Sequence, residues 1–193
     1  MIIQKHTQDI FPTLIMKFDL SQHPHYNRVL EVVEKTKTSY HMIMKDSESS
    51  YSEKTGNAWL DHLLLGDFKD ALQHCVNEWA TSYGVKNCVI SNSWMNRVGV
   101  GGAVKSHRHE LSIVSGAFYP IADKDSTPLK FKSPLSMYRM HEFLVKETLY
   151  TEAHHSVQCK QGELILFPSW LEHYTDDNET QTRVTVSFNT KYA

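Results

Sequence analysis

The stretch that decides the fold class spans residues 86–98 and reads Lys-Asn-Cys-Val-Ile-Ser-Asn-Ser-Trp-Met-Asn-Arg-Val. Its alternating apolar and polar side chains are typical of a strand with one buried face. Similar short segments, most of them bounded by Gly, Pro, Asp or Asn, follow at 111–119, 127–131, 143–149, 155–159, 163–167 and 182–189. Short strands at this spacing predict a mainly β sandwich or barrel over residues 86–193.

The chain before this region has a different pattern. Residues 12–18 fit a first strand, and apolar residues at helical spacing predict helices at about 24–36 and 67–83. Gly84 is placed to end the second helix. Residues 1–85 are therefore expected to form a helical N-terminal part that flanks the β region.

Residues 45–57 are polar and rich in turn-forming residues, which predicts a long loop. Such a loop is a candidate lid over the open end of a barrel, and an idle surface loop is an equal alternative. No segment has the composition of a linker between the two parts. The whole chain, residues 1–193, is therefore expected to be a single domain.

Composition excludes several classes of function. Of the 193 residues, 20 are Lys or Arg and 22 are Asp or Glu, giving a net charge of −2 that argues against nucleic-acid partners. No apolar run approaches the ~18 residues of a spanning helix, and no signal peptide is visible, so no membrane partner is expected. The three cysteines, Cys75, Cys88 and Cys159, are odd in number and form no CxxC pair. We expect buried thiols and a reducing, cytoplasmic setting.

Two clusters carry potential metal ligands. The first is Gly101-Gly102-Ala103-Val104-Lys105-Ser106-His107-Arg108-His109-Glu110, in which two histidines two residues apart would share one face of a strand. The second is an apolar strand that stops at Pro168 and is followed by His173. Imidazole ligands with open positions suit Fe(II) better than a closed structural zinc site. The adjacent pair at 154–155 would point to opposite faces and is expected to be structural.

Arg183 opens a further strand, Arg183-Val184-Thr185-Val186-Ser187-Phe188-Asn189, with one polar and one apolar face. An arginine beside a metal suits a ligand that carries a carboxylate, which it can bind in a bidentate manner. The alternative is a solvated outer face with a surface arginine. The apolar strand residues are expected to be core, and some could keep water from the metal: Ile113, Phe118, Leu164, Leu166 and Phe188.

The segment His107-Arg108-His109-Glu110-Leu111-Ser112-Ile113-Val114-Ser115-Gly116-Ala117-Phe118-Tyr119 resembles a known family motif. The motif, His-x-His-x-x-Ser-x-x-Ser-Gly-x-x-Tyr, belongs to a 2-oxoglutarate/Fe(II) oxygenase family common in phages and marine bacteria and related to prolyl hydroxylases. Residues 129–134, 162–173 and 183–189 also resemble the family's later segments. The resemblance implies a double-stranded β-helix, the cupin-like jelly roll, with Fe(II) as metal and 2-oxoglutarate and O2 as co-substrates.

The resemblance also implies roles for individual residues. His107 matches the first metal ligand and His173 the distal one. Arg183 matches the residue that binds the far carboxylate of 2-oxoglutarate. Tyr119 matches a tyrosine that donates a hydrogen bond to the same carboxylate, and Thr185 follows Arg183 on the same face.

One position departs from the wider superfamily, in which Asp or Glu stands two residues after the first histidine. This chain has His109 there, and we expect it to be the second ligand of a three-histidine site. Glu110 is the alternative if the strand bulges. The difference matters because a neutral imidazole does not offset the charge of the metal.

The function that the resemblance implies is that of a dioxygenase, which hydroxylates a small-molecule or peptidyl substrate and releases succinate and CO2. A cupin-type metal enzyme is an alternative. The cupin pattern, however, requires a Glu at one of the positions that Ser112 and Ile113 occupy, and the cupin interpretation leaves Arg183 without a role. A non-enzymatic jelly-roll binding module with incidental histidines is the other alternative. The sequence specifies neither the primary substrate nor the oligomeric state.

Overall fold

The computed structural model describes residue 4 and residues 6–54, 56–139 and 143–193. Its strands form two antiparallel sheets, one of seven strands in the order β1-β8-β5-β10-β4-β3-β2 and one of three in the order β7-β6-β9. The large sheet comprises β1 (Met16–Asp19), β2 (Ser39–Tyr40), β3 (Met44–Ser49), β4 (Cys88–Val104), β5 (Val114–Ile121), β8 (Glu163–Pro168) and β10 (Arg183–Tyr192). The small sheet comprises β6 (Leu129–Lys132), β7 (His154–Val157) and β9 (His173–Tyr174). The mainly β architecture confirms the fold class predicted from the sequence.

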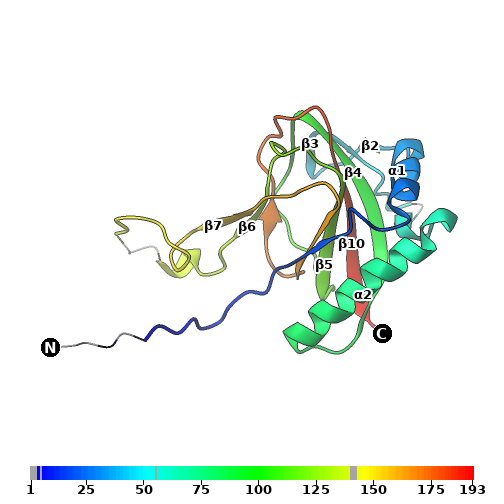
Figure 1. Cartoon of the computed structure of the whole chain (residues 1–193). Coiled ribbons are helices and arrows are strands. Elements are labelled where there is room, and N and C mark those ends of the chain that lie inside the picture. The colour runs from blue at the N-terminus through cyan, green and yellow to red at the C-terminus, as the bar shows by residue number, and fades with distance from the viewer. Residues whose placement is uncertain (1–3, 5, 55, 140–142) are drawn as a thin grey trace.

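Two α-helices, α1 (Tyr26–Lys35) and α2 (Gly66–Tyr83), lie against the large sheet on the side away from β6 and β7 (Figure 1). Three short 3-10 helices complete the regular structure: η1 (Trp59–Asp61), η2 (Leu63–Leu65) and η3 (Ser136–Arg139). The apolar stripe of α2 is buried, and Gly84 ends the helix with φ 80°. A left-handed residue at this position favours glycine, as the sequence indicates.

Alternation along β5 and β8 sends side chains to two separate cores. The helix-side core includes Phe118, Leu164, Leu166 and Phe188, with Ile113 packed against it. All five apolar strand residues expected to be core are therefore core. The idea that some of them shield the metal site is wrong, because they face the helices. The core between the sheets contains a different set: Ala117, Tyr119, Leu129, Phe131, Ile165, Phe167 and Leu171.

Gly116 on β5 lies opposite Phe188 on β10, and a Cβ at Gly116 would overlap the phenyl ring. We expect Gly116→Ala to lower the free energy of unfolding by about 1–3 kcal/mol, the usual cost of overpacking a core. Gly99→Ala is the matched control, since its Cβ would meet only the carbonyl oxygen of Gln181, at an ordinary 3.7 Å. Urea denaturation of both variants measures the difference, and equal stabilities would contradict this packing.

Two predictions made for loop and strand segments are wrong. The first half of the expected loop at 45–57 lies in β3, which pairs with β4, so this half is not a lid. Its side chains are mostly polar, and its buried and exposed positions do not alternate, so it lacks the apolar alternation of a half-buried strand. Residues 143–149, expected to be a strand, form no strand, and Phe143 and Val145 are fully exposed.

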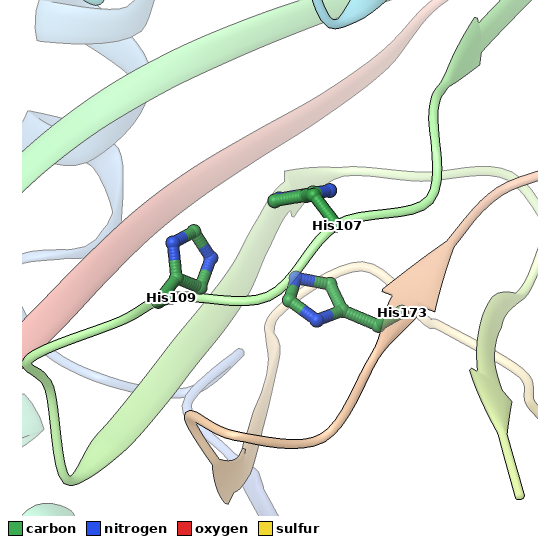
Figure 2. Close-up of side chains that lie close together, drawn as sticks. All are labelled: His107, His109 and His173. Carbon is green, nitrogen blue, oxygen red and sulfur yellow. The ribbon is translucent and has the colours of Figure 1, made fainter. Parts of the chain in front are cut away.

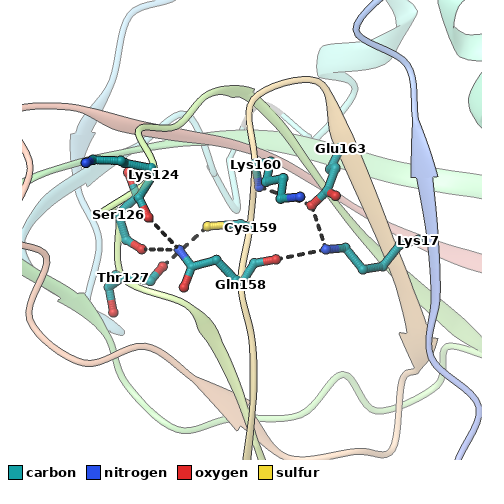
Figure 3. A network of polar contacts seen from close by, with 8 residues as sticks. All are labelled: Lys17, Lys124, Ser126, Thr127, Gln158, Cys159, Lys160 and Glu163. Atoms are coloured by element: carbon teal, nitrogen blue, oxygen red, sulfur yellow. Dashed lines mark hydrogen bonds and ion pairs between the residues drawn. The ribbon is translucent and has the colours of Figure 1, made fainter.

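A polar network joins the connections that lead into β6 and β8 (Figure 3). Lys17 on β1 forms an ion pair with Glu163 at 2.8 Å and donates a hydrogen bond to the carbonyl of Gln158 at 3.0 Å. The Gln158 amide donates to the carbonyl of Ser126 at 2.8 Å. Cys159 donates from its Sγ to the carbonyl of Thr127 at 3.4 Å. These contacts fix the starts of the two strands that carry Phe131 and Phe167 into the core between the sheets.

All three cysteines are free and buried. The thiols therefore act as small packing groups.

Across the part of the chain that the structure describes, none of the helices has the length and apolar character needed to cross a membrane.

Candidate metal centre

The segments that carry the three predicted histidine ligands are joined by backbone hydrogen bonds. His107 lies in the connection from β4 to β5, and its N–H donates to the carbonyl of His173 at 3.0 Å. The His173 N–H donates back to His107 at 2.9 Å, and His109 donates to the carbonyl of Ser169 at 3.0 Å. His107 and His109 thus lie on an extended connection with one bridge to β9, and the regular strand expected for them is wrong.

The three imidazoles point toward one another in the cavity between the sheets (Figure 2). One ring nitrogen from each lies within 4.8 Å of the other two. The Nδ1 of His107 donates to the carbonyl of Lys105 at 2.8 Å, and the Nδ1 of His173 donates to the carbonyl of Leu171 at 2.9 Å. These bonds leave the Nε2 lone pairs of both rings free, the form in which histidine binds a metal.

Burial keeps all three imidazoles neutral. Desolvation lowers the pKa of His107, lowers that of His109 to about 4, and lowers that of His173 well below its ordinary value. Neighbouring imidazoles in the cluster add to the shift for His109 and His173. Metal binding at neutral pH therefore requires no proton to be removed from these side chains.

The lowered pKa values predict how the metal-free protein responds to pH. The unfolded chain binds protons at histidines below about pH 6.5, whereas folded His109 binds one only near pH 4. Stability should therefore be highest above pH 6.5 and fall with decreasing pH, by on the order of 3 kcal/mol for His109 alone. Urea denaturation at several pH values with a chelator present measures this. His109→Gln should flatten the curve, and parallel curves would contradict the prediction.

Glu110, the alternative second ligand, does not join the cluster. Its side chain is 76% exposed and lies 3.4 Å from Arg108. The adjacent pair on β7 is also separate, with His154 bonded to Tyr174 at 3.0 Å and His155 to Glu152 at 2.7 Å. The structure therefore brings His109, and not Glu110, to the other two histidines.

Arg183 lines the same cavity and is only 2% exposed, so the alternative of a surface arginine is wrong. Its Nη2 lies 3.3 Å from the Tyr119 hydroxyl, and its guanidinium stacks 4.9 Å from the centre of that ring. The Nε of Arg183 and the hydroxyl of Thr185 are buried without a hydrogen-bond partner. Within the described ranges, no carboxylate pairs with Arg183. A buried cation and unsatisfied donors are costly unless a ligand meets them.

Tyr119 is positioned for Arg183 by a local irregularity of the sheet. The register between β5 and β10 shifts between Val184 and Val186, beside Pro120, which lacks an N–H to donate. Burial raises the pKa of Tyr119, and the nearby Arg183 offsets only part of this shift. The phenol is therefore neutral and can donate a hydrogen bond.

A serine network, which the sequence analysis did not assign to the site, supports two of the histidines. Ser169 donates to Ser112 at 3.0 Å and bonds to Ser115 at 2.8 Å. The network ties the segment after His109 to the segment before His173. The Ser-x-x-Ser spacing of the family motif, formed here by Ser112 and Ser115, is the sequence feature that could have indicated this network.

Other cavity residues were also missed because they lie within strands whose pattern indicates only packing. Trp94 and Asn96 on β4 line the cavity, and the indole lies 5.7 Å from the ring of His109. Phe167 packs 4.7 Å from the ring of His173. These residues shape the space beside the three imidazoles.

The fold and the cavity define a class of protein, a β sandwich with three neutral metal donors and an unpaired buried cation between its sheets. Residues 92–189 match the family model described as "Putative 2OG-Fe(II) oxygenase". The chain belongs to this family of Fe(II)- and 2-oxoglutarate-dependent oxygenases. A search of curated proteins finds no match.

Solved structures give the same fold. HygX from Streptomyces hygroscopicus, with nickel and 2-oxoglutarate bound, is 10% identical with a TM-score of 0.63, over 94% of this chain and 84% of that one. A 2OG-Fe(II) oxygenase family oxidoreductase from Burkholderia pseudomallei is 8% identical with a TM-score of 0.66, covering 93% and 85%. A Pseudomonas putida prolyl-4-hydroxylase is 14% identical with a TM-score of 0.56, covering 94% of each chain. The fold is thus the double-stranded β-helix that the resemblance implies.

Proposed function

We propose that the chain is a 2-oxoglutarate-dependent dioxygenase in which His107, His109 and His173 hold Fe(II). The observation that carries the proposal is the shared cavity, which is lined both by three neutral imidazoles and by a buried guanidinium without a carboxylate partner among the described residues. Bound Fe(II), with 2-oxoglutarate, supplies the activation of O2 that hydroxylates a substrate and yields succinate and CO2.

The chain's own residues position the co-substrate. Arg183 binds the far carboxylate, which satisfies its Nε and offsets its buried charge. Tyr119 donates a hydrogen bond from its phenol to the same carboxylate. Thr185, whose buried hydroxyl lacks a partner, donates a second hydrogen bond beside it. These contacts would hold the acid in the cavity that the three histidines also line.

Apolar side chains exclude water from the reacting end of the cavity. Phe131 and Phe167 lie 5.1 Å apart, between the centres of their rings, and both pack beside His173. Exclusion of water protects a reactive metal site from unproductive reactions.

A cupin-type enzyme would leave the buried Arg183 without a role.

The remaining proposals concern the substrate and setting. We expect a small-molecule or peptidyl substrate, in line with the hygromycin B bound to HygX in one structure and with the prolyl-4-hydroxylase. The helices and the large sheet share one core, which supports a single domain over residues 1–193. The free, buried cysteines suit a cytoplasmic protein, and the near-balanced charge argues against a nucleic-acid substrate.

Anaerobic thermal melts with Fe(II) and 2-oxoglutarate test the function. Each ligand at 100 times its dissociation constant should add about 2.7 kcal/mol to stability. Aerobic incubation should then release succinate slowly even without the primary substrate. Stabilisation by the metal but not by 2-oxoglutarate would favour a cupin-type enzyme, and no stabilisation by either would refute the proposal.

A further inference from the structure

The three histidines contribute no negative charge to the site. Backbone carbonyls fix His107 and His173 as neutral rings with a free Nε2, and His109 completes the set as a third imidazole. Tyr119, which lines the same cavity, is a neutral phenol, so it adds no charge either. The protein donors thus leave the charge of a bound divalent metal undiminished.

No carboxylate compensates from the cavity wall. Among the residues that the structure describes, the cavity lining includes neither Asp nor Glu. Glu110 pairs with Arg108, and Glu172 accepts hydrogen bonds from Ser106 at 2.7 Å and from Lys132 at 3.4 Å. Both acids that flank the histidine segments are therefore engaged at the surface.

The charges in the cavity then do not balance. A divalent metal and the Arg183 guanidinium bring three positive charges, and 2-oxoglutarate brings two negative ones. One positive charge remains in a buried space, where an uncompensated charge is costly. With a carboxylate in place of His109 the same site would be neutral, so the excess arises from this one position.

The wall of the cavity carries a polar group suited to meet an anion. Asn96 lies in this wall, and its Oδ1 accepts a hydrogen bond from Ser49 at 2.7 Å. Its Nδ2 donates to the Oγ of Ser187, which also lines the cavity, at 3.4 Å. The cavity wall therefore offers an oriented amide donor.

We propose that the primary substrate carries a carboxylate that enters the cavity beside His109 and supplies the missing negative charge. This inference rests on the proposed function, because the excess charge exists only when the metal and 2-oxoglutarate are bound. The substrate class is thus a carboxylate-bearing small molecule or peptide terminus. A neutral alcohol, amide or sugar would leave the charge uncompensated.

Calorimetric titration of the Ni(II)- and 2-oxoglutarate-loaded protein tests the charge. Acetate and formate are compared with the neutral isosteres acetamide and formamide, so that shape is matched and only charge differs. We expect the anions to bind at least about tenfold more tightly. Equal binding by the wild-type protein would overturn the inference, whatever the variants show.

Two variants separate the charge at the metal from the charge at the surface. His109→Asp adds the missing negative charge, keeps a metal ligand and should abolish the preference for acetate, whereas Glu110→Gln, at an exposed neighbour, should retain it. Loss of the preference in both, or in neither, would overturn the inference. If chloride binds as tightly as acetate, the compensating anion comes from the solvent and not from the substrate, and the inference is overturned.

The same titration distinguishes this inference from the proposed function. If wild-type Ni(II)-loaded protein does not bind 2-oxoglutarate, the proposed function fails, and the inference fails with it. If 2-oxoglutarate binds and the acetate preference is absent, the inference alone fails.

Discussion

His173→Ala is expected to abolish stoichiometric metal binding and to lower succinate release by at least about a thousandfold. His173 is the buried member of the cluster, and its Nδ1 bond to Leu171 holds the ring in place. Its removal leaves two ligands on one short connection, too few for a stable site. Metal analysis after gel filtration and a succinate assay measure the two effects.

The matched control for this variant is His155→Ala. His155 lies on β7 and pairs with Glu152, away from the cavity. It should retain metal and turnover within about twofold, as surface substitutions usually do. Near-normal iron content in His173→Ala, with its fold intact by circular dichroism, would contradict the assigned ligand.

Arg183→Met is expected to weaken 2-oxoglutarate binding by about 30- to 1000-fold, the effect of truncating one partner of a buried charge pair. Metal binding should remain, since the three candidate metal ligands are histidines. The ligand-free variant should be at least as stable as wild type, because a similar apolar side chain replaces a buried cation that has no counterion. Calorimetry and urea denaturation measure the two effects.

Arg97→Met provides the control for Arg183→Met. Arg97 lies on the neighbouring strand β4, paired with Val184, and its guanidinium donates to the carbonyl of Val33 on the helix side. It should leave 2-oxoglutarate binding unchanged. If Arg183→Met binds the acid within about threefold of wild type, the far carboxylate lies elsewhere.

Sequence reasoning was strongest where one face of an element is buried. The alternation in residues 86–98 and 182–189 corresponds to β4 and β10, and the stripe of 67–83 to α2. It failed for β3, whose buried and exposed side chains do not alternate, and for β9, which has two residues and is too short to show a period. Pairing with β4 and with β6, rather than local pattern, defines those strands.

The site was predictable to the extent that its residues follow a spacing. The His-x-His pair, His173 and Arg183 all line one cavity, as the family resemblance implies. Trp94 and Asn96 were missed because their inward direction depends on which face of β4 meets the small sheet. That choice is a property of the packed sheets and cannot be obtained from a single strand.

A crystal structure of the anaerobic Ni(II) complex with 2-oxoglutarate tests the central claim most directly. The account predicts one metal ion at about 2.1 Å from a ring nitrogen of each of His107, His109 and His173. It also predicts that the far carboxylate of the acid is bound by Arg183. A metal held through Glu110, or a 2-oxoglutarate carboxylate turned away from Arg183, would contradict it.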